Sequence, residues 1–248
     1  MSMPKTVETG SFEGDTVNNF LRGVLQATIA TFSLPDPIVE VGSLQREGRE
    51  ELVNLRPLFP DRPYVGIDMQ PGPGVDRVEN VESLTLDSSS AGTVIAMNTF
   101  EHVRRLWLAI AEVKRILRPD GVLFVSTPFY FHIHAYPSDY WRLTPEAWDS
   151  LLEREFPQRI LGQCGPRTRP LHVWAVAFGH DYPPISDEQV ADYEAAISRY
   201  AKSPPETLRT LRYLSVQWLV GRRPMAPHLD RDSFELQLRR GTSEAKAA

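Results

Sequence analysis

The stretch from Ser126 to Arg142 holds the side chains best suited to chemistry. It places two histidines, an aspartate and an arginine among six aromatic residues. Imidazole titrates near neutral pH, so a histidine can take a proton from a reacting hydroxyl or amine. We choose His134 over His132 as this general base, and we assign Asp139 to the catalytic group with it.

The rest of this stretch has two interpretations. A small-molecule pocket combines apolar walls with a few placed polar groups, whereas buried aromatic rings can equally close the end of a sheet as core. Arg142 either pairs with Asp139 as scaffold or grips an acidic acceptor. A His-x-His pair can hold a metal, but only Asp139 offers a third ligand, so we expect no metal here. The predicted acceptor-binding residues are Phe129, His132, Tyr136, Tyr140, Trp141 and Arg142.

Alternating apolar runs and amphipathic segments must position these groups. Helical periodicity appears near 15–32, 101–117 and 144–155. Because parallel strands need crossover connections, this alternation predicts an α/β fold of the Rossmann-like, doubly wound kind. Its sheet would be mostly parallel with helices on both faces. The expected strands are 38–42, 64–68, 75–78, 93–97, 121–127 and 171–178.

Two strand ends carry the residue types of a nucleoside site. The first strand ends at Gly42 and the second at Asp68. A glycine allows close approach to the backbone, and an acidic residue at the second strand can accept hydrogen bonds from a ribose diol. The alternative is that Gly42 only makes a turn and Asp68 only caps a loop.

Two longer motifs carry a family resemblance. Residues 93–103 read TVIAMNTFEHV, and residues 118–123 read RPDGVL. Together with the two strand ends they resemble the class I S-adenosylmethionine-dependent methyltransferases of type 11, over roughly residues 36–155. The resemblance implies an enzyme with S-adenosylmethionine as cofactor. It also implies the cofactor-binding residues Glu40, Gly42, Ser43, Asp68, Met69, Asn80, Val81 and Asn98.

We expect methyl transfer to a small or medium-sized acceptor, at oxygen or nitrogen rather than carbon, because transfer to these atoms benefits from removal of the acceptor proton. The glycine loop after the first strand departs from the family pattern, which leaves an alternative function open. The family's Gly-x-Gly-x-Gly loop is replaced by GSLQREG at 42–48, with only its first glycine in register. The alternative is a catalytically inactive methyltransferase-like module for binding or assembly. A nicotinamide oxidoreductase is disfavoured, because its own glycine fingerprint is also missing.

The composition of the chain disfavours several other classes of protein. The chain has 248 residues, 42% of them hydrophobic, and a net charge of −5. This charge disfavours nucleic acid as a partner, and no apolar run is long enough to span a membrane. The N-terminus does not resemble a signal peptide, so we expect a cytoplasmic location. Cys164 is the only cysteine, which excludes an internal disulfide framework.

The sequence suggests two regions. Residues 1–180 form the predicted methyltransferase-like domain, and residues 181–248 a helical C-terminal extension with helices near 187–200 and 206–219. From about residue 221 the composition is typical of a disordered tail. The C-terminal helices are a candidate surface for a homodimer.

Overall fold

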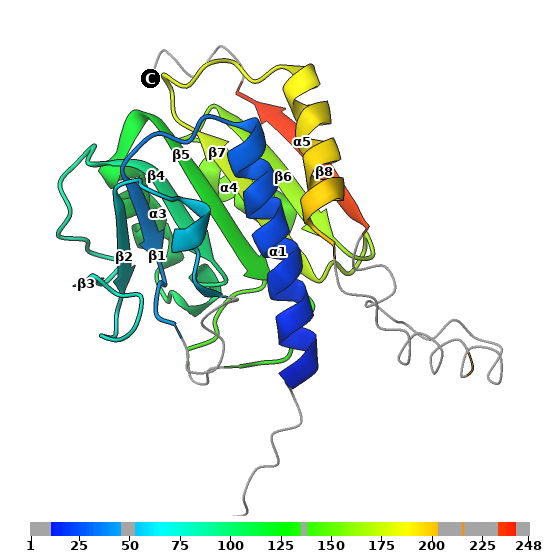
Figure 1. Ribbon diagram of the computed structural model, residues 1–248, viewed down its shortest axis with the longest axis horizontal. Helices are drawn as coiled ribbons and strands as arrows, with labels where there is room; N and C mark the ends of the chain where they lie inside the picture. The colour runs from blue at the N-terminus through cyan, green and yellow to red at the C-terminus, as the bar shows by residue number, and fades with distance from the viewer. Residues whose placement is uncertain (1–10, 46–52, 135–137, 203–214, 216–232, 242–248) are drawn as a thin grey trace, which may run out of the picture.

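The computed structural model describes residues 11–45, 53–134, 138–202, 215 and 233–241. These residues build one eight-stranded sheet with helices on both faces (Figure 1). The strand order is β3-β2-β1-β4-β5-β7-β6-β8. The sheet therefore confirms the predicted α/β doubly wound architecture.

The sheet is parallel across five neighbouring strands and antiparallel beyond them. Strands β3, β2, β1, β4 and β5 pair in parallel, whereas β7 runs antiparallel to both β5 and β6. The chain leaves β1 towards β2 on one side and later crosses to β4 on the other, so a switch point lies beside β1. The bounds are β1 Ile38–Val41, β2 Tyr64–Asp68, β3 Arg77–Val78, β4 Ala91–Met97, β5 Leu117–Pro128, β6 Gln158–Cys164, β7 His172–Phe178 and β8 Phe234–Arg240.

Two apolar clusters cover the two faces of the sheet. Helices α1 (Ser11–Thr31) and α5 (Asp187–Tyr200) lie side by side over one face. The hydroxyl groups of Thr28 and Tyr193 join them at 3.0 Å. Helices α3 (Leu106–Ile116) and α4 (Pro145–Leu152) cover the other face. Both faces are thus buried, which explains why strands such as β1 are buried throughout their length.

The segment predicted as one helix over 101–117 begins differently. Residues Phe100–His102 form a 3-10 turn, η2, and α3 starts only at Leu106. The reason is non-local: the indole Nε1 of Trp141 donates to the carbonyl of Val103 at 2.7 Å. That carbonyl would otherwise accept a hydrogen bond within the helix. The prediction of a helix start at Glu101 is therefore wrong.

Two strands, β6 and β8, were not predicted from the sequence. Gly162 in β6 leaves room for Trp174 of β7, since a Cβ there would lie 2.1 Å from its Cε2 atom. Strand β8 pairs with β6 at the sheet edge, and its Phe234, Leu236 and Leu238 pack against the core. The expected disorder from residue 221 onward is therefore wrong for residues 234–240.

The remaining C-terminal expectations have mixed outcomes. Helix α5 confirms the predicted segment near 187–200 and begins with a capping box between Ser186 and Gln189. The predicted helix at 206–219 lies outside the described residues, apart from Ser215. The division of the chain at residue 180 stays a prediction. Among the helices described, none has the length and apolar character needed to cross a membrane.

Candidate active site

A cavity of about 770 Å³ opens where strands β1, β2 and β4 end. Its wall includes Gly42 after β1, Asp68 at the end of β2 and Asn98 after β4. The cavity continues past β5 to His134 in the following loop. Ligands of open α/β sheets bind at this edge and beside the switch point. The volume is in the range of small-molecule sites, about 300–1,000 Å³.

Gly42 makes the sharp turn that leaves β1. Its φ angle is +82°, a conformation that favours glycine. A Cβ at this position would lie 2.2 Å from Oγ1 of Thr99. The close approach that requires glycine is therefore to Thr99, a residue that the sequence analysis did not single out.

Two acidic side chains face this end of the cavity. Asp68 accepts hydrogen bonds from the backbone N–H of Gln70 at 2.9 Å and of Leu44 at 3.4 Å. Glu40 accepts a hydrogen bond from the hydroxyl of Tyr64 at 2.6 Å. Burial raises the pKa of Glu40 to about 7. Because a carboxylate offers about four acceptor positions, Asp68 retains capacity for a ligand.

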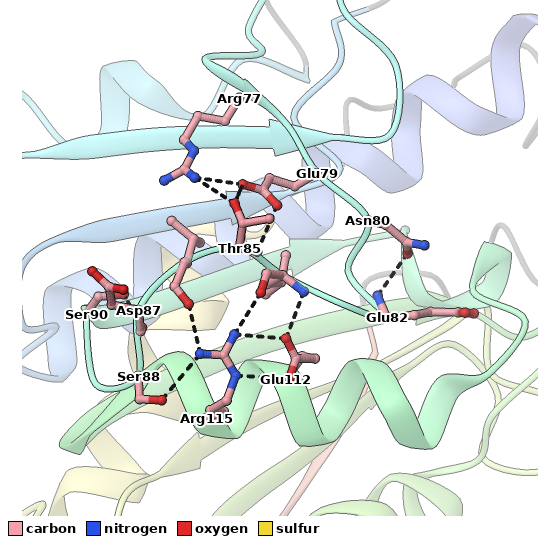
Figure 2. A network of polar contacts seen from close by, with 12 residues as sticks. Arg77, Glu79, Asn80, Glu82, Thr85, Asp87, Ser88, Ser90, Glu112 and Arg115 are labelled. Atoms are coloured by element: carbon pink, nitrogen blue, oxygen red, sulfur yellow. Dashed lines mark hydrogen bonds and ion pairs between the residues drawn. The ribbon is translucent and has the colours of Figure 1, made fainter.

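The loop after β3 forms a second wall and is tied down firmly. Glu79 accepts hydrogen bonds from the N–H and hydroxyl of Thr85 at 3.0 and 2.6 Å. Arg115 of α3 donates to the carbonyls of Leu84 and Leu86. Figure 2 shows this network together with Asn80, whose Oδ1 accepts the N–H of Glu82. These contacts hold Asn80 and Val81 at the cavity wall.

The far end of the cavity collects buried and half-buried ionisable groups. Glu101 is fully buried, and burial raises its pKa to about 8. Nε2 of His102 lies 3.7 Å from Oε1 of Glu101. His172, at the start of β7, is also buried, and its pKa falls to about 3 because protonation would place a charge away from water. All three residues line the cavity.

His134 is oriented by a buried carboxylate. Oδ2 of Asp139 lies 3.0 Å from Nδ1 of His134 and also accepts the backbone N–H of that residue at 2.9 Å. Arg142 holds both oxygens of Asp139, at 2.6 and 2.7 Å. These hydrogen bonds keep the pKa of Asp139 well below its usual range. Desolvation lowers the pKa of His134 more than Asp139 raises it, so the imidazole is neutral at pH 7.

The central strands match a known family profile in sequence. A family profile described as a methyltransferase domain matches residues 61–125, from the turn before β2 into β5. Over these residues the chain is therefore similar in sequence to a methyltransferase domain. This match indicates an enzyme of the transferase class with S-adenosylmethionine as its cofactor. No protein with a curated description matches the chain in sequence.

Solved methyltransferases share the fold at low sequence identity. A Burkholderia thailandensis 1,6-didemethyltoxoflavin-N1-methyltransferase with bound S-adenosylhomocysteine is 17% identical, with a TM-score of 0.50. The match covers 67% of this chain and 80% of that one. A Thermotoga maritima protein described as a possible histamine N-methyltransferase is 16% identical, with a TM-score of 0.47, covering 66% of this chain and 91% of that one. At these identities the likeness concerns the fold.

Most of the predicted cofactor residues lie on the cavity wall. Ser43 does not: it is buried beside Gly66, and a Cβ on that glycine would lie 2.7 Å from its Oγ. The assignment of Ser43 to the cofactor therefore does not fit its position. The predicted residues that line the cavity are Glu40, Gly42, Asp68, Met69, Asn80, Val81 and Asn98.

Few of the predicted acceptor-binding residues lie on the cavity wall. Tyr140 lines the cavity, and Tyr136 lies outside the described residues. The indole of Trp141 donates a hydrogen bond to the carbonyl of Val103, and Arg142 donates to the carboxylate of Asp139. Phe129 and His132 are not on the wall either, whereas the unpredicted Phe131 is. Glu101 and His102 were expected at a helix start, with His102 capping or positioning that helix, and His172 carried no sequence signal.

The irregular glycine loop leaves the methyltransferase cavity open where it is described. Leu44 forms part of the wall, and its side chain lies against Gly72. Gln45 packs against Gly74 and does not line the cavity. Arg46 and Gly48 lie outside the described residues. The described part of this loop therefore favours the enzyme over the inactive module.

Proposed function

We propose that the cavity binds S-adenosylmethionine along β1, β2 and β4, and that the protein methylates an oxygen or nitrogen of a small acceptor. The observation that carries the proposal is one continuous cavity. It joins the carboxylate of Asp68 at one end to the imidazole of His134 at the other. When bound, the cofactor supplies a methyl group activated on a sulfonium sulfur.

The residues present fit this cofactor. The carboxylate of Asp68 is placed to accept hydrogen bonds from the ribose hydroxyls. Met69 and Val81 offer apolar contacts for the adenine, beside the amide of Asn80. Glu40 and Gly42 line the cavity at the turn that would carry the methionine part, and Asn98, just after β4, would face the sulfonium.

The acceptor end supports proton removal. Methyl transfer joins the acceptor atom to the methyl carbon as the carbon–sulfur bond breaks, and the acceptor releases its proton. Because Asp139 faces Nδ1 of His134, it favours the proton on that nitrogen and leaves Nε2 to take the acceptor's proton. Alignment of the reacting atoms in the cavity supplies the rest of the rate enhancement.

Calorimetry with S-adenosylhomocysteine tests the binding step, since the product needs no acceptor. We expect saturable binding with one ligand per chain and no comparable binding of NAD⁺. A second experiment measures S-adenosylhomocysteine release from S-adenosylmethionine over a panel of phenols, carboxylic acids and amines. No binding of the product at about 1 mM, a very weak affinity, would contradict the proposal. The expected homodimer and cytoplasmic location stay predictions.

A further inference from the structure

The strongest unassigned feature is a cluster of three ligand-type side chains at the acceptor end of the cavity. Glu101, His102 and His134 each offer one atom, and these atoms all lie within 4.8 Å of one another. We propose that they bind a divalent first-row transition metal ion, such as Zn²⁺, through one carboxylate and two imidazoles. The sequence pointed only to His132 and His134, with Asp139 as a third ligand, and we expected no metal there.

The buried carboxylate of Glu101 is the main evidence for a bound cation. Its side chain is 0% exposed, and neither carboxylate oxygen accepts a hydrogen bond from another described residue. A buried carboxylate without a partner is costly unless it is neutralised or coordinates an ion. Glu101 also lines the cavity, together with His102 and His134.

The two histidines are prepared as neutral ligands. Nδ1 of His102 lies 2.8 Å from the backbone carbonyl of Ser138, which fixes the proton on Nδ1 and leaves a lone pair on Nε2. His134 has its Nδ1 3.0 Å from the buried Asp139. Histidines that ligate metals commonly donate their second ring nitrogen to a carbonyl or a carboxylate in this way. Ser138 is already such a partner for His102, and Asp139 lies beside Nδ1 of His134 as its ion-pair partner.

The distances are compatible with an ion after small side-chain adjustments. Zinc binds imidazole nitrogen and carboxylate oxygen at about 2.0–2.2 Å, so ligand atoms of one ion lie roughly 3–3.5 Å apart. The His102 and His134 rings are already in edge contact, with centroids 4.7 Å apart. One carboxylate and two imidazoles also leave coordination positions open, as catalytic sites do.

The role of the ion rests on the proposed function. An acceptor hydroxyl bound at an open position would lose its proton to solvent water more readily, because the cation stabilises the resulting oxygen anion. In the loaded protein His134 is then a ligand, and the ion replaces the imidazole as the group that promotes deprotonation. The inference therefore favours an acceptor that presents an oxygen donor.

The test is a metal titration of the full, tag-free chain after removal of metals with a chelator. We expect calorimetry with ZnCl₂ to show one ion per chain, and CoCl₂ to produce the visible absorption of bound Co²⁺. The variants Glu101→Gln, His102→Gln and His134→Gln should each weaken Zn²⁺ binding at least tenfold. His180→Gln is the matched control, since this histidine is exposed and does not line the cavity.

Two results would overturn the inference: no Zn²⁺ binding at about 1 mM, or equal binding by wild type and all three variants. Thermal unfolding checks that each variant folds. If Glu101→Gln does not fold, the Zn²⁺ affinities of the His102→Gln and His134→Gln variants test the site, since both histidines are partly exposed. Binding of S-adenosylhomocysteine is measured in the same metal-free protein. Product binding without Zn²⁺ binding rejects only the metal site, whereas the reverse result rejects the proposed function.

Discussion

The carboxylate of Asp139 lies 3.0 Å from Nδ1 of His134, and its side chain is only 1% exposed. Burial lowers the pKa of His134, and the negative charge of Asp139 opposes this effect. Removing the charge should therefore lower the pKa of His134 further.

The variant Asp139→Asn tests this relationship. We expect NMR titration of the His134 ring to give a lower pKa in the variant than in the wild type, because Arg142 also loses its charge partner and repels the imidazolium. Asp192→Asn, on the exposed side of α5, is the control and should leave the titration unchanged. An unchanged or higher pKa in Asp139→Asn would show that Asp139 does not tune this imidazole.

A substitution at Gly42 should destabilise the fold locally. Gly42→Ala places a Cβ at a φ of +82° and 2.2 Å from Oγ1 of Thr99. We expect a loss of about 1–3 kcal/mol in the free energy of unfolding, measured by urea denaturation. Gly241→Ala should have little effect, since the atom nearest to its added Cβ would lie 3.4 Å away.

The double variant Gly42→Ala/Thr99→Ala separates the two causes. Thr99→Ala removes the Oγ1 and Cγ2 atoms that crowd the new Cβ, so part of the lost stability should return. The part that remains reflects the backbone conformation. If the double variant is no more stable than the sum of its single changes predicts, the contact with Thr99 is not the source of the strain.

The stability of the metal-free protein should depend on pH through Glu101. Its folded-state pKa is raised from 4.5 to about 8 by burial, so the folded state holds this proton more tightly than the unfolded chain. The resulting stabilisation is complete below pH 4.5 and is lost as pH rises to about 8. Glu101→Gln removes this contribution.

We therefore expect the free energy of unfolding to fall less for Glu101→Gln than for wild type between pH 4.5 and 8. Glu40 has a raised pKa in both proteins, so the difference between them isolates Glu101. Glu194→Gln, exposed on α5, should behave as the wild type. Parallel pH profiles for wild type and Glu101→Gln would mean that Glu101 is already ionised in the folded protein.

The cofactor end of the cavity was largely predictable because it depends on local patterns. Short apolar strands end at Val41, Asp68 and Met97. Parallel strands bring these ends to one edge of the sheet. Residue type at a strand end was therefore enough to predict Asp68, and the family resemblance added Asn98; both line the same cavity.

The acceptor end was less predictable because long-range contacts shape it. The backbone N–H groups of Tyr140 and Trp141 donate to the carbonyl of Glu101, and the indole of Trp141 donates to the carbonyl of Val103. These contacts turn Glu101 and His102 out of the expected helix and into the cavity wall. Helical periodicity contains no record of a partner about 40 residues away along the chain.

The most direct measurement of the central claim is the affinity for S-adenosylhomocysteine of wild type, Asp68→Asn and Asp192→Asn, measured by calorimetry. A hydrogen bond to a charged group contributes about 1.5–3 kcal/mol, so loss of the Asp68 charge should weaken binding by roughly ten- to a hundredfold. Asp192→Asn should bind as the wild type does. Equal affinity in all three proteins, or no binding by the wild type, would contradict the account.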